Sequence, residues 1–245
     1  MKHLFINVSD RSPAPEIMDD KTCDRSTLFR TVNQFYYINR FLSNSRKFIQ
    51  QYIINDMEKD TLKSYTFLEL GAGGCDIALW LDSYCKRKKI TVKIYCLDND
   101  PRIIDYGTQK CSGVPGISII HNDISNIVSL SIKPDYVFCN HLIHHLSDTQ
   151  VSDFFIQLAS ITQRIAVVND IERSRIAYFL YYCISSLFFR NSYAIHDGCL
   201  SIQKSFKLNE LERRIECSKL PIHCSVLRRF PFRLLCILDK KVQQY

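Results

Sequence analysis

Hydrophobic positions in the first quarter of the chain recur at the spacing of a helix. The first 25 residues are polar and contain Pro13 and Pro15, whereas over 26–54 apolar side chains recur three and four positions apart. The pattern is interrupted at 43–45, whose sequence is Ser-Asn-Ser. It predicts a loose N-terminal arm followed by two helices ahead of a core domain.

From residue 64 onward, short apolar runs alternate with segments of helical periodicity. The runs expected to form buried strands are 65–70, 91–97, 117–120, 136–139 and 165–168. A helix is expected over 76–84. Asp100 ahead of Pro101 marks a second helix start, and Ser147 with Gln150 three residues later forms a capping box for a third.

The last third of the chain continues with helices and a closing hairpin. A long helix is expected over 172–189, and a shorter one opens at Asn209 with Glu212 as its capping partner. Two strand-like runs flank Phe230-Pro231. Because the connection between them is so short, these two strands must run antiparallel.

Five successive strand–helix units imply parallel strands with right-handed crossovers, and therefore a doubly wound α/β sheet. We expect residues 1–60 to form an arm and a helical lid. Residues 61–245 would form one ligand-binding domain, with a helical insertion at about 172–208. Ligands of such sheets bind at the carboxyl ends of the strands, so the residues just after each strand are the candidate site.

The first predicted strand ends in segment 69–73, whose sequence is Glu-Leu-Gly-Ala-Gly. Glycine lets the backbone turn sharply and lets a ligand approach, and the helix that follows offers free N–H groups. Asp76 stands where a dinucleotide fingerprint has its third glycine, and no Gly-Lys-Ser/Thr follows, so NAD, FAD and a Walker-type loop are excluded. Glu69, two positions before the first glycine, suits a ligand with an ammonium group; a tight turn without a ligand is the alternative interpretation.

Acidic and amide side chains also follow the next three strands. Asp98 ends the second strand, where a carboxylate can accept both hydroxyls of a ribose, whereas Asp100 is better placed as a helix cap. Asp123 and Ile124 follow the third strand and suit the amino group and the ring of adenine. Asn140 follows the fourth strand, just ahead of two consecutive histidines.

Taken in order over about residues 64–170, these motifs resemble those of the class I S-adenosylmethionine (SAM)-dependent methyltransferases. The resemblance implies SAM as cofactor, S-adenosylhomocysteine (SAH) as product, and a seven-stranded sheet of order 3-2-1-4-5-7-6 with strand 7 antiparallel. The residues that it assigns to cofactor binding are Glu69, Gly71, Ala72, Gly73, Asp98, Asn99, Asp123, Ile124 and Asn140. Cys75 departs from the family pattern, which commonly has a third glycine there, although Gly74 lies beside it.

Three histidines are candidates for catalysis. Methyl transfer is an in-line displacement at a sulfonium, and a hydroxyl acceptor would need a base near neutral pH. His144 and His145 follow the fourth strand beside the expected methyl group, although the His-His-Leu stretch is often structural in the family. His196 lies in the expected insertion, where Asp197 and Gly198 also indicate a plain turn.

Aromatic side chains are concentrated at 178–189 and 35–37. Core packing explains part of them, and the others would wall an apolar acceptor pocket or rest on a membrane surface. Segments 11–20, 38–40 and 196–201 resemble, more loosely, small bacterial methyltransferases, some of which accompany polyketide synthesis. We therefore expect O-methylation of a small aromatic or lipid-like hydroxylated acceptor.

Two other functions remain as alternatives: a nucleic-acid or protein methyltransferase, and a SAM-fold binding protein without turnover. Basic residues are scattered, and the fourth strand is not followed by the Asn-Pro-Pro-Tyr stretch that amino-methylating nucleic-acid enzymes commonly carry. A nucleic-acid partner is therefore not favoured.

Composition sets broader limits. A net charge of +7 with 46% hydrophobic and 23% charged residues is typical of a globular protein and permits an anionic partner without requiring one. Eleven cysteines, an odd number without Cys-x-x-Cys or Cys/His ligand spacing, indicate free thiols in a reducing compartment and no metal site. The N-terminus does not resemble a signal peptide, and the longest apolar run, 176–189, falls short of the roughly 20 residues that span a bilayer. We expect a cytoplasmic protein and leave its oligomeric state open.

Overall fold

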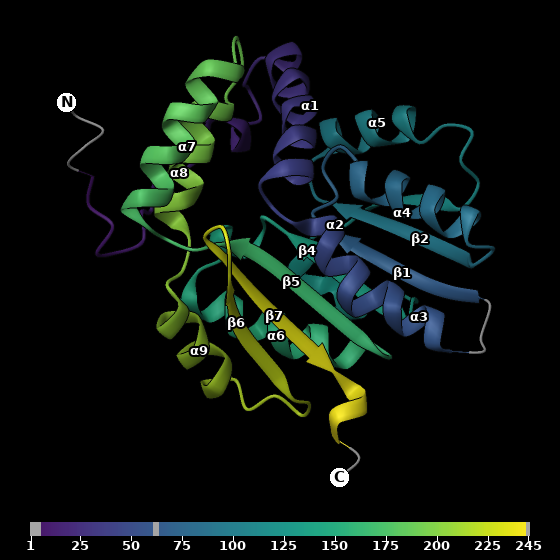
Figure 1. Cartoon of the computed structure of the whole chain (residues 1–245). Helices are drawn as coiled ribbons and strands as arrows, with labels where there is room; N and C mark the ends of the chain where they lie inside the picture. Colours follow the sequence, from purple (N-terminus) through teal and green to yellow (C-terminus); the bar gives the residue numbers. More distant parts are fainter. Residues whose placement is uncertain (1–5, 61–63, 244–245) are drawn as a thin grey trace.

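Seven strands form one sheet in the order β3-β2-β1-β4-β5-β7-β6 (Figure 1). The structure is a computed structural model that describes residues 6–60 and 64–243. Strands β1 to β5 run parallel, whereas β7 runs antiparallel to both β5 and β6. The predicted doubly wound sheet, its order and its antiparallel seventh strand are therefore confirmed. The strands are β1 (Ser64–Leu70), β2 (Thr91–Asp98), β3 (Ile117–His121), β4 (Tyr136–Asn140), β5 (Ile165–Ile171), β6 (Cys224–Arg229) and β7 (Arg233–Asp239).

Helices connect the strands and extend beyond the carboxyl edge of the sheet (Figure 1). Among the described residues these are α1 (Arg25–Phe41), α2 (Ser45–Phe48), α3 (Asn55–Lys59), α4 (Asp76–Arg87), α5 (Pro101–Lys110), α6 (Asp148–Ile161), α7 (Arg175–Phe188), α8 (Ala194–Lys204) and α9 (Leu208–Cys217). Asp100 caps α5 with Pro101 in its first turn, and Ser147 and Gln150 form the capping box of α6, both as predicted. No helix of the described chain is long and apolar enough to cross a bilayer.

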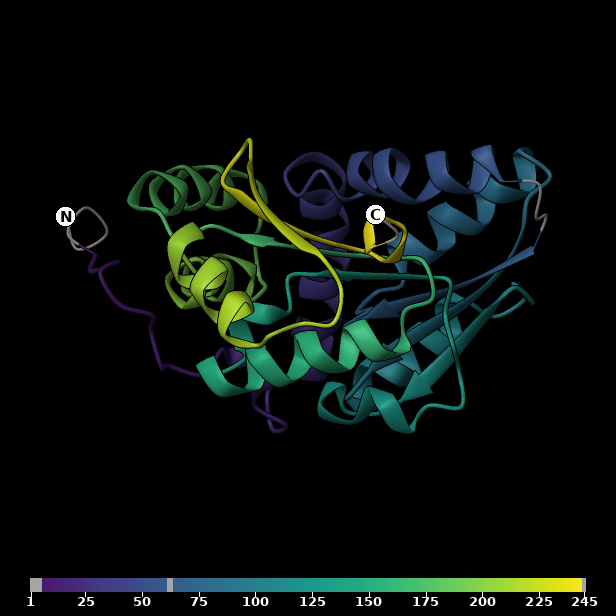
Figure 2. The same cartoon turned by 90° about the horizontal axis from the view of Figure 1, so that it is seen from below.

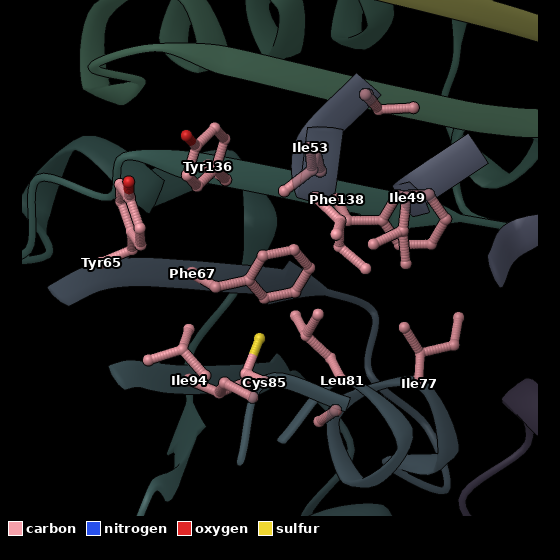
Figure 3. Close-up of a cluster of buried hydrophobic side chains, with 14 of the residues drawn as sticks. Ile49, Ile53, Tyr65, Phe67, Ile77, Leu81, Cys85, Ile94, Tyr136 and Phe138 are labelled. Atoms are coloured by element: carbon pink, nitrogen blue, oxygen red, sulfur yellow. The ribbon is translucent and has the colours of Figure 1, made fainter. Parts of the chain in front are cut away.

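Alternating side chains of the central strands are buried in two separate cores, one on each face of the sheet. Phe67 and Phe138 pack with residues of α4 and of segment 48–57 on one face (Figure 3). Leu68 and Val137 pack with α6 and α9 on the other, and Figure 2 shows helices on both sides of the sheet. Because side chains in a strand alternate between its two faces, the nearly continuous apolar runs of β1 and β4 serve both cores at once.

The predicted break between the two N-terminal helices lies at Asn44. Its backbone is left-handed, with a φ of 56°, and α1 ends just before it. The chain then stays helical from α2 through a π-helical segment, Ile49–Ile54, to the end of α3. The two expected helices are therefore present, the second of them in three consecutive pieces.

The N-terminal arm is held against the domain over its described part, contrary to the expectation of a loose segment. The guanidinium of Arg11 donates to the carbonyl oxygens of His144, Leu146 and Lys204 at 2.7–3.0 Å. It also stacks on the ring of Phe206, 3.7 Å from its centroid. A polar sequence was expected to stay in solvent, but a planar guanidinium with several donors can tie such a segment to exposed carbonyl groups.

Two local predictions in the last third of the chain are wrong. Helix α9 is capped at Lys207, whose backbone N–H donates to the carboxylate of Glu210, so Asn209 does not open it. Residues 196–198 lie in α8 and form no turn. Gly198 is there because α7 packs against it: a Cβ at this position would lie 2.2 Å from the hydroxyl oxygen of Tyr181. Glycine in a helix can therefore mark a close helix contact as well as a turn.

Candidate functional site

A cavity of about 670 Å³ opens at the carboxyl ends of β1, β2 and β4. All nine residues that the sequence assigned to cofactor binding line it, together with two of the three candidate catalytic histidines. These residues are Glu69, Gly71, Ala72, Gly73, Asp98, Asn99, Asp123, Ile124, Asn140, His144 and His145. Parallel strands bring their carboxyl ends to one edge of the sheet, so residues that are far apart in the sequence meet there.

The glycine turn is held by Asp98. Gly71 and Gly73 have φ angles of +66° and +50°, which glycine adopts without strain. One carboxylate oxygen of Asp98 accepts from the N–H of Gly73 at 3.0 Å, and the other accepts from the N–H of Asp100 at 3.1 Å. Burial raises the pKa of Asp98. Since a carboxylate oxygen can accept more than one hydrogen bond, both oxygens retain capacity for a ligand hydroxyl.

Cys75 adopts the left-handed conformation that glycine favours at this position, with a φ of 55°. Its sulfur packs close to Gly107 of α5, where a Cβ would lie 3.0 Å from the cysteine Sγ. The adjacent Gly74 faces Val32 of α1, and a Cβ there would lie 3.0 Å from Cγ1 of that valine. Cysteine fits at position 75 because Gly107 of α5 leaves room for its sulfur. Gly74 has a different role, because it leaves room for α1 to approach the turn.

Asp76, at the start of α4, also lines the cavity, although it was not a candidate for cofactor binding from the sequence. Its Oδ1 accepts from the amide of Asn39 on α1 at 3.1 Å. Its Oδ2 is buried and has no hydrogen-bond partner among the residues that the structure describes. Burial raises its pKa. The pKa of Glu69 is raised further, by complete burial first and by the charge of Asp76 second. Asp76 could have been recognised in the sequence as a site residue, because it is an acidic residue that directly follows the glycine turn.

Asn140 is fixed through both ends of its amide. Its Nδ2 donates to Oδ1 of Asn39 at 2.8 Å, and its Oδ1 accepts from Asn169 at 2.9 Å and from Arg233 at 3.1 Å. Burial lowers the pKa of the Arg233 guanidinium to about 10. Asn39 therefore links Asn140 to Asp76, and this connection ties helix α1 to the end of β4 and to the start of α4.

A second group of ionisable side chains lies in the same cavity; we call Glu16, Asp19, His144, His145 and Lys204 the Glu16 cluster. Oε1 of Glu16 lies 3.6 Å from Nζ of Lys204, 3.7 Å from Nε2 of His144 and 3.8 Å from Nε2 of His145. It also accepts from the hydroxyl of Ser201 at 3.0 Å. Burial raises the pKa of Glu16. Glu16 and Lys204 were not candidates from the sequence, because neither stands in a recognisable motif after a strand.

The two adjacent histidines have different surroundings. His144 is buried, and its Nδ1 lies 2.8 Å from Oδ1 of Asp170, whose other oxygen accepts from the backbone N–H of His144. Burial acts to raise the pKa of that aspartate, but the imidazole of His144, together with His141 and the Arg233 guanidinium, lowers it below its usual value. His145 is partly exposed to the cavity, with Nδ1 3.3 Å from Nζ of Lys204 and 3.6 Å from Oδ2 of Asp19. His144 is thus anchored to the scaffold, whereas His145 faces the cavity.

Glu16, His144 and His145 form a donor set that can hold a metal ion, with ligand atoms within 4.8 Å of one another. The ammonium of Lys204 lies against the same carboxylate and the same imidazole. A divalent cation placed there would be repelled by this ammonium. We therefore interpret the Glu16 cluster as a site for proton transfer.

His196 is not among the described residues that line the cavity. It lies on α8 with its side chain 58% exposed, and its Nδ1 contacts Oδ1 of Asp197 at 2.7 Å. The buried carboxylate of Asp197 accepts from the backbone N–H groups of Ile17 and Met18, so it holds the N-terminal arm. Residues 196–198 were expected to form a turn at the acceptor site. They lie in a helix, where consecutive residues point in different directions, and Lys204 of α8 reaches the cavity instead.

Comparison with known proteins agrees with this geometry. Residues 67–164 match the family model described as methyltransferase domain. The plantazolicin methyltransferase BpumL in complex with SAH superposes with a TM-score of 0.64 at 13% identity, covering 91% of this chain and 92% of that one. A SAM-dependent methyltransferase from Aquifex aeolicus gives 0.54 at 13% identity, with coverage of 88% and 97%.

The magnesium protoporphyrin IX methyltransferase ChlM from Synechocystis PCC 6803, with bound SAH, gives a TM-score of 0.52 at 15% identity, with coverage of 88% and 99%. No curated protein matches the sequence. At these identities, the solved structures establish a shared fold.

Proposed function

We propose that this chain is a SAM-dependent methyltransferase and that it methylates a small hydroxylated acceptor in the cavity at the strand ends. Its fold and the family match over residues 67–164 support this proposal. The observation that carries the proposal is that one cavity is lined both by the strand-end motifs and by the Glu16 cluster. The first set of residues suits a nucleoside with an amino-acid tail. The second offers a base to an acceptor.

The strand-end residues fit SAM. Oδ2 of Asp76, which has no partner in the described part of the chain, would accept from the ammonium of the methionine part, beside Glu69. At Gly73 a Cβ would meet nothing within 4 Å, so the turn borders open space that a ligand can enter. Asp98 would accept the ribose hydroxyls, with Asp123 and Ile124 at the adenine. When bound, SAM supplies an electrophilic methyl group on a sulfonium that becomes neutral on transfer.

The acceptor would lie between α1 and the insertion after β5. α1 contributes Phe35 and Ile38 to the cavity wall, and the insertion contributes Tyr181 and Lys204. We therefore keep the proposed division into a lid over residues 1–60, a binding domain, and an acceptor-site insertion at about 172–208. The apolar part of this wall favours an aromatic or lipid-like molecule with a hydroxyl group.

We assign the role of general base to His145. Its imidazole would take the proton of the acceptor hydroxyl as the oxygen attacks the methyl group. Glu16 and Asp19, each within 4 Å of one imidazole nitrogen, would stabilise the resulting imidazolium. The ammonium of Lys204 lies 3.3 Å from Nδ1 of the same imidazole. His144, held by Asp170, would position the loop that carries His145.

The proposal is tested by calorimetry with SAM and by screening hydroxylated aromatic acceptors for SAH release. We expect SAM binding by the wild-type protein and turnover on at least one acceptor. His145→Gln should retain SAM binding and lose turnover. Failure to bind SAM would overturn the cofactor assignment, and SAM binding without turnover on any small acceptor would favour a binding protein.

A further inference from the structure

Helix α7 exposes a continuous apolar face to solvent. Six of its large hydrophobic side chains are between 38% and 73% exposed, while Ala177, Tyr178 and Ser185 are buried on its other side. Their spacing of three and four places them along one face of the helix. The exposed residues are Ile176, Phe179, Leu180, Ile184, Leu187 and Phe188. Single exposed apolar residues are common in proteins, but a whole helix face of them marks an interaction surface.

Large aromatic side chains are also exposed on the second half of α1. Tyr37 and Phe41, one helical turn apart, are exposed there. Earlier on the same side of this helix, Gln34 donates to the carbonyl oxygen of Arg190, just after the end of α7. Figure 1 shows both helices beyond the carboxyl edge of the sheet.

The tip of the β6–β7 hairpin adds a further exposed aromatic ring, that of Phe230, which is the most exposed large hydrophobic residue described. The carbonyl oxygen of Phe230 accepts from the amide of Asn44 at 2.8 Å, so this tip adjoins the connection after α1. Three segments from distant parts of the sequence therefore contribute to one apolar region, which we call the α1–α7 face.

The charged side chains in the two segments that carry α1 and α7 are all positive. No aspartate or glutamate occurs in residues 173–196 or in residues 25–55. Exposed cations within these ranges include Arg175 and Arg190 at the two ends of α7, and Arg40 and Lys47 near Phe41. Aromatic and aliphatic side chains flanked by arginine and lysine match the chemistry of an anionic lipid surface, which takes up the rings and attracts the cations. A second copy of the chain would instead oppose these cations with its own.

We propose that the α1–α7 face docks the protein on the surface of an anionic membrane. Docking uses side chains that the catalytic assignment does not involve, so it does not depend on methyl transfer. It also places the cavity near the lipid, because Tyr181 on the inner side of α7 lines that cavity. Docking of this kind is peripheral: the 14 residues of α7 lie at the interface and do not cross the bilayer.

The test is co-sedimentation of the full chain with vesicles of phosphatidylcholine alone or mixed with phosphatidylglycerol. We expect binding to the mixed vesicles, and weaker binding to them as salt is added. The double variant Leu187→Glu with Phe188→Glu should bind at least about tenfold more weakly, because two side chains lose apolar burial. Ile156→Glu is the matched control, since Ile156 is an exposed apolar residue on α6, outside the face.

Circular dichroism of each variant establishes that it is folded, and sedimentation velocity without vesicles reports association between copies. No binding of the wild-type protein to mixed vesicles would overturn the proposal. Equal binding by the folded Leu187→Glu, Phe188→Glu variant would also overturn it. A wild-type dimer that this variant dissociates, without vesicle binding, would assign the face to a second copy of the chain.

Discussion

Replacing Asp76 by asparagine is expected to weaken SAM binding while leaving the SAM-free protein no less stable. In the SAM-free protein, Oδ2 of Asp76 is buried and has no partner within residues 6–60 and 64–243, whereas Oδ1 accepts one hydrogen bond from Asn39. Asparagine keeps an oxygen for that hydrogen bond and removes the buried charge. The variant therefore separates the ligand contact from the structural contact of this side chain.

The magnitude follows from the kind of contact that is lost. A hydrogen bond to a charged partner contributes about 1.5–3 kcal/mol, so the Kd of SAM should rise by roughly 10- to 150-fold. SAH carries the same amino group and should lose a similar amount of affinity. The analogue 5′-methylthioadenosine lacks the amino-acid part, and its affinity should not change.

The pH dependence of stability supplies an independent check. Burial raises the pKa of Asp76 in the folded state. Below the unfolded-state pKa, Asp76 is protonated in both states and does not change the free energy of unfolding. As the pH rises above that value, the unfolded state loses its proton first, so the folded state becomes less stable relative to it. Asparagine does not ionise, so the stability of Asp76→Asn should fall less than that of the wild-type protein as the pH rises.

Isothermal titration calorimetry with the three ligands measures the affinities, and thermal unfolding across the pH range measures stability. Asp105→Asn is the control, because Asp105 is an exposed carboxylate on α5 that pairs with Arg25. An unchanged SAM affinity in Asp76→Asn would refute the assignment of the ammonium to this residue. An equal loss of affinity for 5′-methylthioadenosine would show instead that the variant distorts the whole site.

Three further outcomes are expected. Asp98→Ala should weaken SAM binding in calorimetry by about 100-fold or more, since the ribose loses charged acceptors and Gly73 loses its hydrogen bond to the Asp98 carboxylate. An unchanged affinity would contradict the ribose assignment. His145→Gln should lower kcat at saturating SAM by at least tenfold, about 1.4 kcal/mol, whereas His196→Ala should leave kcat nearly unchanged. A loss of kcat in His196→Ala without a loss in His145→Gln would assign the base to His196. Treatment with a chelator should leave turnover unchanged, and loss of activity restored by a divalent cation would show that Glu16 and its neighbouring histidines hold a metal.

The sequence by itself determined the features that depend on local chemistry. Glycines at 71 and 73 mark positions that need positive φ angles, and Asp100 with Pro101 marks a helix start that the structure reproduces. Alternating strands and helices fix a parallel sheet, and the motifs after successive strands gave the family resemblance and with it the strand order. These signals are readable because each arises within a few residues of chain or from a repeating unit.

Tertiary structure alone decided which side chains meet in the cavity. Glu16, His145 and Lys204 are separated by more than a hundred and eighty residues from first to last, yet they lie within 4 Å of one another through contacts of the arm, the β4 loop and α8. His196 was a candidate because of its expected place in the insertion, but the helical geometry of α8 directs it to solvent and brings Lys204 inward. Proximity between distant segments depends on how the elements pack, and the sequence around a single residue does not encode that packing.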